Sequence, residues 1–143
     1  MKNKTLAAYL ALFLGLFGAH RFYLKDWRDL WGWLHIVATA IGLVGMRRTW
    51  ALGQDDPLAW LLMPLLGLSI FSACLAAMIY GLASQARWNG AYNPDAPDNA
   101  RAGGTSGMTI FAVILALLLG ATALMSAIAF AGQRYFEYSL KSV

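Results

Sequence analysis

Few residues of this sequence could do chemistry within its long apolar runs. His20 and His35 are the only histidines, and His35 is the one ionisable residue inside the run 30–46. Ionisable residues at membrane depth mark ion or proton pathways by default, so His35, with His20 and Thr39 within reach, defines a possible ion path. The ordinary interpretation is that both histidines are satisfied inside a helical bundle. Two histidines and a threonine are too few ligands to predict a metal site, and no cofactor is expected.

No catalytic residues are predicted. No acidic residue lies inside an apolar run, and neither a Ser-His-Asp arrangement nor an HExxH motif occurs. Ser69, Ser72 and Ser126 are interpreted as helix-packing serines. Cys74 is the only cysteine, which excludes an intrachain disulfide, and its apolar surroundings predict a buried, inert thiol. We therefore do not expect an enzyme.

The composition is typical of an integral membrane protein. Hydrophobic residues make up 59% of the 143 residues and charged residues only 13%, whereas a soluble domain is about one-quarter charged. The net charge of +4 comes from Lys and Arg residues at the ends of apolar runs. This distribution favours the lipid bilayer and anionic head groups as partners and argues against nucleic acid. We expect the protein in a bacterial inner membrane.

Four apolar segments must position these residues, and backbone in lipid has to be helical. The segments run from Thr5 to about Leu24, from Leu30 to Met46, from Pro57 to Ala83 and from Met108 to Ala131. They predict an all-α membrane protein with four transmembrane helices in an antiparallel bundle, the first two forming a tight helical hairpin. We divide the chain into this hairpin (1–50) and a second helical pair (57–143) joined by a solvent loop (84–107).

Four spans place both termini on one side of the membrane. That side carries six basic residues and the opposite side five, which weakly favours cytoplasmic termini. The six are Lys2, Lys4, Arg47, Arg48, Arg134 and Lys141, and the five are Arg21, Lys25, Arg28, Arg87 and Arg101.

Small residues recur every four positions in three of the segments, which allows close helix contacts. The stripes are Ala7, Ala11, Gly15 and Ala19; Ser69, Ala73, Ala77 and Gly81; and Ala112, Ala116 and Gly120. We interpret them as packing within the bundle, with a self-association face as the alternative.

The first segment ends in an unusual stretch, Gly-Leu-Phe-Gly-Ala-His-Arg-Phe-Tyr. Gly15 and Gly18 permit close approach of a neighbouring helix. Positive charge on Arg21 opposes the negative end of the helix dipole, and Phe22 and Tyr23 suit the membrane interface. These residues and His20 therefore predict an anchored helix exit, and they are the candidate interaction motif.

This motif resembles the signature of the transmembrane-two (TM2) domain family: Leu-Gly-x-x-Gly-x-His/Asp-Arg-Phe-Tyr, a short turn and a second apolar helix. The matching residues are Leu14, Gly15, Gly18, His20, Arg21, Phe22 and Tyr23. Lys25 departs from the glycine that the family often has there, and no acid follows Trp60 in the family's Trp-x-x-x-Asp spacing. The resemblance covers the first third of the chain and implies a membrane hairpin; in animal members it implies signalling or cell-surface roles.

The sequence thus favours a small multi-pass membrane protein that acts through helix–helix, lipid or membrane-complex interactions, including a homo-oligomer, without catalysis. The alternative is a small transporter or channel component that uses His35 and His20 in an ion or proton path.

Overall fold

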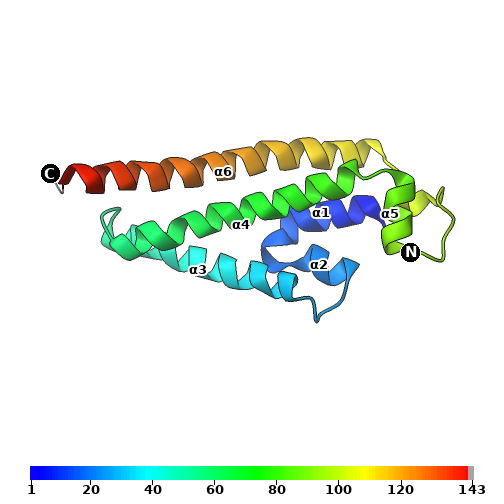
Figure 1. Cartoon of the computed structure of the whole chain (residues 1–143), viewed down its shortest axis with the longest axis horizontal. Helices are drawn as coiled ribbons and strands as arrows, with labels where there is room; N and C mark the ends of the chain where they lie inside the picture. The colour runs from blue at the N-terminus through cyan, green and yellow to red at the C-terminus, as the bar shows by residue number, and fades with distance from the viewer. Residues whose placement is uncertain (142–143) are drawn as a thin grey trace.

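The computed structural model describes residues 1–141, in which every regular element is a helix and no strand occurs. Three long helices run side by side along the molecule (Figure 1). They are α3 (Leu30–Leu52), α4 (Pro57–Leu82) and α6 (Gly107–Lys141). Each is long and apolar enough to cross a membrane. The structure therefore has three candidate spans in its described part, against the four expected from the sequence.

The central helix of the three is α4, which packs against α3 on one side and α6 on the other. Its start is well defined: Pro57 occupies the first turn, and the Asp56 carboxylate accepts a hydrogen bond from Ala59 N at 2.9 Å. The second segment extends beyond its expected end at Met46, to Leu52. The 23 residues of α3 reach about 35 Å, enough for the hydrocarbon layer.

The expected single helix over residues 5–24 is wrong. The chain forms α1 (Lys4–Leu14), a 3₁₀ turn η1 (Gly15–Phe17) and a short α2 (Ala19–Leu24). Gly18 breaks the helix because its φ of 66° is left-handed, a conformation that suits glycine. The chain reverses there, so α2 runs back toward the end at which α1 begins (Figure 1). We call α1, η1 and α2 the re-entrant hairpin.

The hairpin reaches only part of the way along the bundle. Eleven residues of α1 span about 16 Å, roughly half of a 30 Å hydrocarbon layer. Non-helical backbone at such depth has to be buried in protein. Thr39 of α3 meets this need, since its hydroxyl donates to Leu16 O in η1 at 3.1 Å.

The predicted stripes of small residues pack inside the bundle. Ala7 and Ala11 of α1, Ala73 and Ala77 of α4 and Ala112 and Ala116 of α6 are all buried. A Cβ on Gly15 would lie 2.5 Å from Ala73 Cβ, so α1 and α4 nearly touch at this level. These stripes therefore pack α1, α4 and α6 against one another within the bundle, as the sequence indicated.

The segment 84–107, expected to be a mobile solvent loop, contains a helix that lies across the end of the bundle. Ser84 caps α5 (Gln85–Tyr92), and a second 3₁₀ turn, η2 (Arg101–Gly103), follows. Trp88 of α5 is 1% exposed and donates to Lys2 O at 2.9 Å. The end is thereby closed by a folded cap.

The N-terminus and the end of α6 lie at opposite ends of the bundle (Figure 1), which differs from the shared side expected for four spans. At the N-terminal end, buried Lys4 donates to Ala83 O at 2.8 Å and to Thr105 Oγ1 at 2.7 Å. At the other end, Arg134 of α6 pairs with Asp55 at 3.1 Å. The three candidate spans of the described residues fit this arrangement.

Candidate functional site

The polar residues of the motif meet α3 and α4 near the N-terminal end. We call His20, Arg21, Asp29, His35 and Tyr80 the polar cluster. Close approach of α2 to α3 creates it: Gly18 lies against Gly32, and a Cβ on Gly18 would be 2.8 Å from the Gly32 carbonyl carbon.

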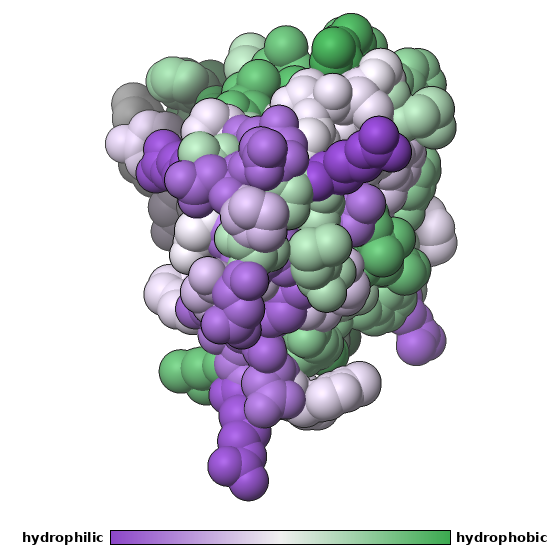
Figure 2. Space-filling model, turned by 90° about the vertical axis from the view of Figure 1, so that its right-hand side faces the viewer, coloured by the Kyte–Doolittle hydropathy of each residue, from purple (hydrophilic) through white to green (hydrophobic). Residues whose placement is uncertain are grey.

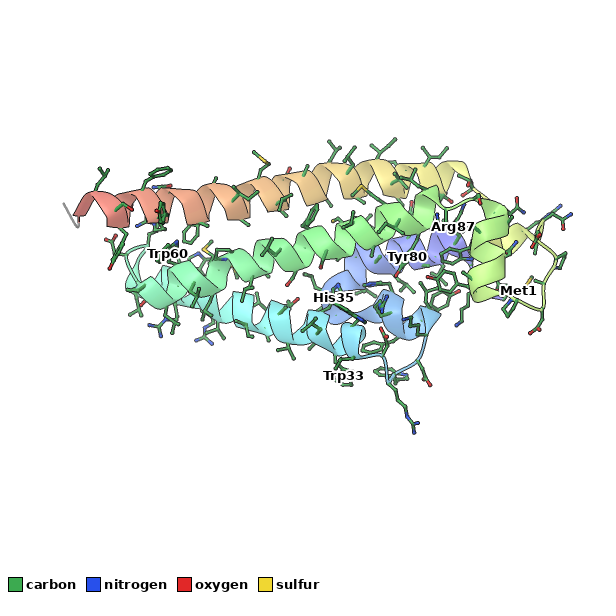
Figure 3. The ribbon with its side chains drawn as sticks, viewed as in Figure 1. Met1, Trp33, His35, Trp60, Tyr80 and Arg87 are labelled. Carbon is green, nitrogen blue, oxygen red and sulfur yellow. The ribbon has the colours of Figure 1, made fainter. Side chains whose placement is uncertain are left out.

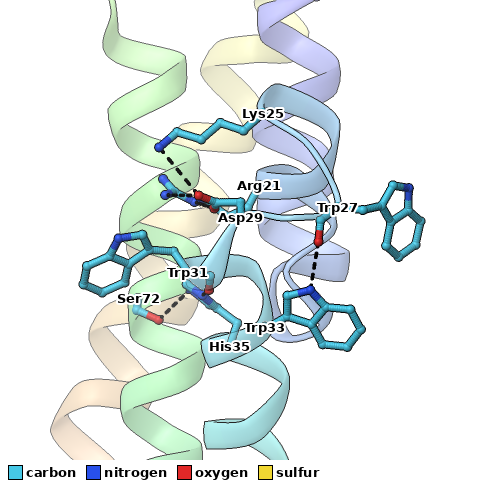
Figure 4. Close-up of polar contacts among 8 residues, drawn as sticks. All are labelled: Arg21, Lys25, Trp27, Asp29, Trp31, Trp33, His35 and Ser72. Carbon is cyan, nitrogen blue, oxygen red and sulfur yellow. Dashed lines mark hydrogen bonds and ion pairs between the residues drawn. The ribbon is translucent and has the colours of Figure 1, made fainter.

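Arg21 forms the ion pair of the cluster (Figure 4). Its Nε lies 2.7 Å from Asp29 Oδ2 and its Nη2 lies 3.3 Å from Oδ1. Lys25 Nζ is 3.6 Å from the same carboxylate. Burial opposes ionisation of Asp29, but the hydrogen bonds and charge of Arg21 outweigh it and lower the Asp29 pKa. The pair links α2 to the first turn of α3.

His20 is the most deeply buried polar group of the cluster, at 1% exposure. Its ring meets the His35 ring edge-on at a centroid distance of 5.3 Å and the Tyr80 ring at 5.8 Å. Neither of its ring nitrogens has a hydrogen-bond partner among the described residues. A buried nitrogen without a partner is uncommon and needs a physical explanation.

His35, in contrast, is hydrogen-bonded through both nitrogens (Figure 4). Nδ1 lies 2.8 Å from Trp31 O and Nε2 lies 3.2 Å from Ser72 Oγ of α4. The ring lines a groove of about 200 Å³ between α3 and α4. Thr39, expected beside His35 on an ion path, instead donates to Leu16 O.

Phe22 and Tyr23 fasten the hairpin to its neighbours. The Phe22 ring stacks on Trp27 at 4.9 Å and lies against Gly32, where a Cβ would come within 2.5 Å of the ring. The Tyr23 hydroxyl accepts a hydrogen bond from Asn3 N at 2.8 Å. Both side chains therefore act within the protein.

The side chains of the described residues do not form a set of metal ligands. The described residues hold no group of three or more His, Cys, Asp or Glu side chains. Buried Cys74 faces α6, where a Cβ on Gly120 would lie 2.8 Å from Cys74 Cβ. It lies on a different side of α4 from Ser72 and the histidines.

No motif in the sequence points to the residues that α4 and α5 contribute at this end. Ser72, expected to be a packing serine, is hydrogen-bonded to His35, and Tyr80, which belongs to no motif, lies against His20. Both reach these histidines only through helix packing. Tyr80 also borders a groove of about 570 Å³ between α4 and α5, which we call the corner groove. Its lining consists of Ile79, Tyr80, Leu82, Ala83, Arg87, Trp88, Ala91 and Tyr92.

The corner groove combines apolar walls with one cation. Ile79 and Leu82 are 60% and 73% exposed on the outside of α4, and Trp88 packs between Tyr80 and Tyr92 at centroid distances of 5.9 and 4.5 Å. Arg87 lies above them on α5 (Figure 3). Viewed from this end, hydrophilic residues occupy the middle of the surface and hydrophobic residues flank it (Figure 2).

Comparison with known protein families finds a match for the first third of the chain. Residues 1–51 match the model of the TM2 domain, which confirms the predicted resemblance and its extent. No curated protein and no solved structure matches the chain. The matched range contains the re-entrant hairpin and nearly all of α3, and ends before α4.

Proposed function

We propose that this small membrane protein, with a TM2 domain as its first third, acts by binding rather than by catalysis, and that it binds an anionic phospholipid in the corner groove. The observation that carries the proposal is the position of Arg87, above an apolar wall at the end of the α4 span. Guanidinium groups bind phosphate through paired hydrogen bonds, which matches a phospholipid head group.

The rest of the groove suits the same ligand. Exposed Ile79 and Leu82 offer a surface for acyl chains, and the groove is also lined by the amphipathic rings of Trp88 and Tyr92, a residue type that suits the head-group region. The N-terminal end also carries more positive charge than the C-terminal end. It holds seven of the eleven basic residues and four of the seven acids: Lys2, Lys4, Arg21, Lys25, Arg28, Arg87 and Arg101, with Asp26, Asp29, Asp95 and Asp98.

Native mass spectrometry of protein released from mixed phosphatidylglycerol and phosphatidylcholine nanodiscs tests the proposal. We expect the wild type to retain phosphatidylglycerol. Arg87→Gln should reduce this retention about tenfold, because it removes one charge-assisted contact. Arg101→Gln, which removes an exposed cation at the same end, is the matched control and should retain the lipid. Equal retention of both lipids by the wild type, or equal loss in both variants, would overturn the proposal.

The charge distribution also supports an orientation. Seven basic residues against four favour a cytoplasmic N-terminal end and a C-terminus on the opposite side of a bacterial inner membrane. Reporter fusions at the two termini should therefore give opposite results; a cytoplasmic signal from both would restore the four-span arrangement.

A homo-oligomer or larger membrane complex is a further form of binding. Because the small-residue ladders are occupied within the bundle, such a contact would use the outer face of α3, where Leu34, Val37 and Val44 are each about half exposed. Disulfide crosslinking of Val37→Cys tests it: wild-type Cys74 is buried and provides the uncrosslinked reference.

The second candidate function is a small transporter or channel component with His35 and His20 on an ion or proton path. The unpartnered nitrogens of buried His20 favour it. Against it, α3 and α4 pack backbone to backbone further along, where a Cβ on Gly42 would lie 2.5 Å from Leu66 N. Proton flux in liposomes that His35→Ala abolishes would support this candidate, and no flux would exclude it.

A further inference from the structure

Two cations at the N-terminal end have no carboxylate partner, and they lie near opposite ends of α5. Arg87 is in the first turn of α5, and Lys2 lies beside Asn93, the residue that caps the end of this helix. Neither forms an ion pair with any described residue. Cations of this kind at a membrane surface attract anionic lipid head groups.

The position of Lys2 is fixed by hydrogen bonds to α5 and α2. Its backbone N donates to Asn93 Oδ1 at 2.5 Å, and its carbonyl accepts hydrogen bonds from Trp88 Nε1 at 2.9 Å and Asn93 Nδ2 at 3.0 Å. Lys2 Nζ donates to Leu24 O at the end of α2, which leaves the remaining ammonium hydrogens for a ligand. The fold therefore holds the second cation in place.

The two cations lie side by side across the end of the bundle. Arg87 is at one end of α5 and Met1, the neighbour of Lys2, is near the other (Figure 3). Asn93 follows Arg87 by six residues, which is about 9 Å along a helix. Because α5 lies across the direction of the three candidate spans (Figure 1), this separation lies in the plane of the lipid head groups.

Each cation lines a groove, and the two grooves adjoin. Arg87 lines the corner groove, and Lys2 lines a second groove of about 460 Å³ beside it. Tyr92 lines both. Asp95 is the one acid in either lining, and it forms no ion pair with Lys2. Positive charge therefore exceeds negative charge over the joined grooves.

We propose that the lipid of the corner groove carries two phosphates joined by a glycerol, as cardiolipin does; this inference rests on the proposed function. One phosphate binds Arg87, and the second binds Lys2 on the other side of Tyr92. A lipid with a single phosphate would leave one of the two cations without a counterion. A pyrophosphate group suits the spacing less well, because its two phosphates share an oxygen and lie closer together than the two cations.

Competition between cardiolipin and phosphatidylglycerol tests the proposal. Native mass spectrometry follows protein released from phosphatidylcholine nanodiscs that contain both anionic lipids at equal phosphate content. The wild type should retain cardiolipin about tenfold better than phosphatidylglycerol, because one further charge-assisted contact forms. Lys2→Gln should abolish this preference and still retain phosphatidylglycerol, since the glutamine amide keeps a donor for Leu24 O. Lys2→Arg, which keeps the charge, should keep the preference.

Arg28→Gln is the matched control, because Arg28 is an exposed cation of the same end that lines neither groove. It should leave the preference unchanged; an equal loss in Arg28→Gln, or a loss in Lys2→Arg, would overturn the role of Lys2. Retention of phosphatidylglycerol by the wild type without a preference for cardiolipin would overturn the second phosphate site and leave the proposed function intact. Retention of neither lipid would overturn both.

Discussion

Gly18 is the residue on which the re-entrant hairpin depends, and Gly18→Ala should destabilise the protein by about 2–5 kcal/mol. Alanine at a left-handed φ of 66° costs about 1–2 kcal/mol. Its Cβ would also lie 2.8 Å from both the Cα and the carbonyl carbon of Gly32. That backbone belongs to a packed helix and cannot move freely, so overpacking adds about 1–3 kcal/mol.

Two other glycines separate these contributions. Gly53 has a φ of 85° with nothing within 4 Å of an added Cβ, so Gly53→Ala carries backbone strain alone in an exposed link. Gly90 lies inside α5 with an equally open surrounding, and Gly90→Ala should be neutral or slightly stabilising.

The assay is reversible unfolding in mixed micelles of dodecyl maltoside and SDS, followed by far-UV circular dichroism. The expected order of stability is Gly90→Ala, then Gly53→Ala, then Gly18→Ala. Protection of residues 19–24 from hydrogen exchange should fall most in Gly18→Ala. A Gly18→Ala protein as stable as Gly53→Ala would refute the proposed close contact between Gly18 and Gly32.

Two further substitutions test the polar ends of the bundle. A hydrogen bond from Arg48 lowers the Asp56 pKa. The stability that this pair contributes is therefore fully present above the ordinary carboxyl pKa and is lost as the pH falls through the lowered pKa. Asp56→Asn, which keeps the α4 cap, should lower the thermal midpoint at pH 7, and the two proteins should have the same midpoint below the lowered pKa. Lys4→Met removes the bonds to Ala83 O and Thr105 and should cost about 1–3 kcal/mol, with faster tryptic cleavage at Arg87 and Arg101; unchanged cleavage would mean that Lys4 does not hold the cap.

Much of the architecture could be predicted from composition and spacing. Long uncharged runs require helices in lipid, so α3, α4 and α6 follow from their apolar residues alone. The alanine and glycine ladders indicated which helix faces would pack, and the stretch from Gly15 to Tyr23 identified the TM2 domain. These features depend on local residue type, which a sequence displays directly.

The path of the first segment could not be predicted in the same way. Residues 5–24 are apolar enough for one span, and an isolated glycine in a membrane helix usually marks a packing contact. Whether Gly18 continues the helix or reverses it depends on partners distant in sequence: Gly32, which leaves room for the turn, and Thr39, which bonds the freed carbonyl of Leu16. That reversal leaves three candidate spans among the described residues.

The sequence by itself determined that the protein is helical, belongs in a membrane and carries a TM2 domain, because apolar length and motif spacing are local properties. Only the tertiary structure decided what the motif's polar residues contact. His20 and Arg21, which the sequence placed at a membrane boundary, are turned inward by the hairpin onto His35, Asp29 and Tyr80. The physical reason is that the motif's own letters do not say which helices will lie beside it, and helix packing alone selects those neighbours.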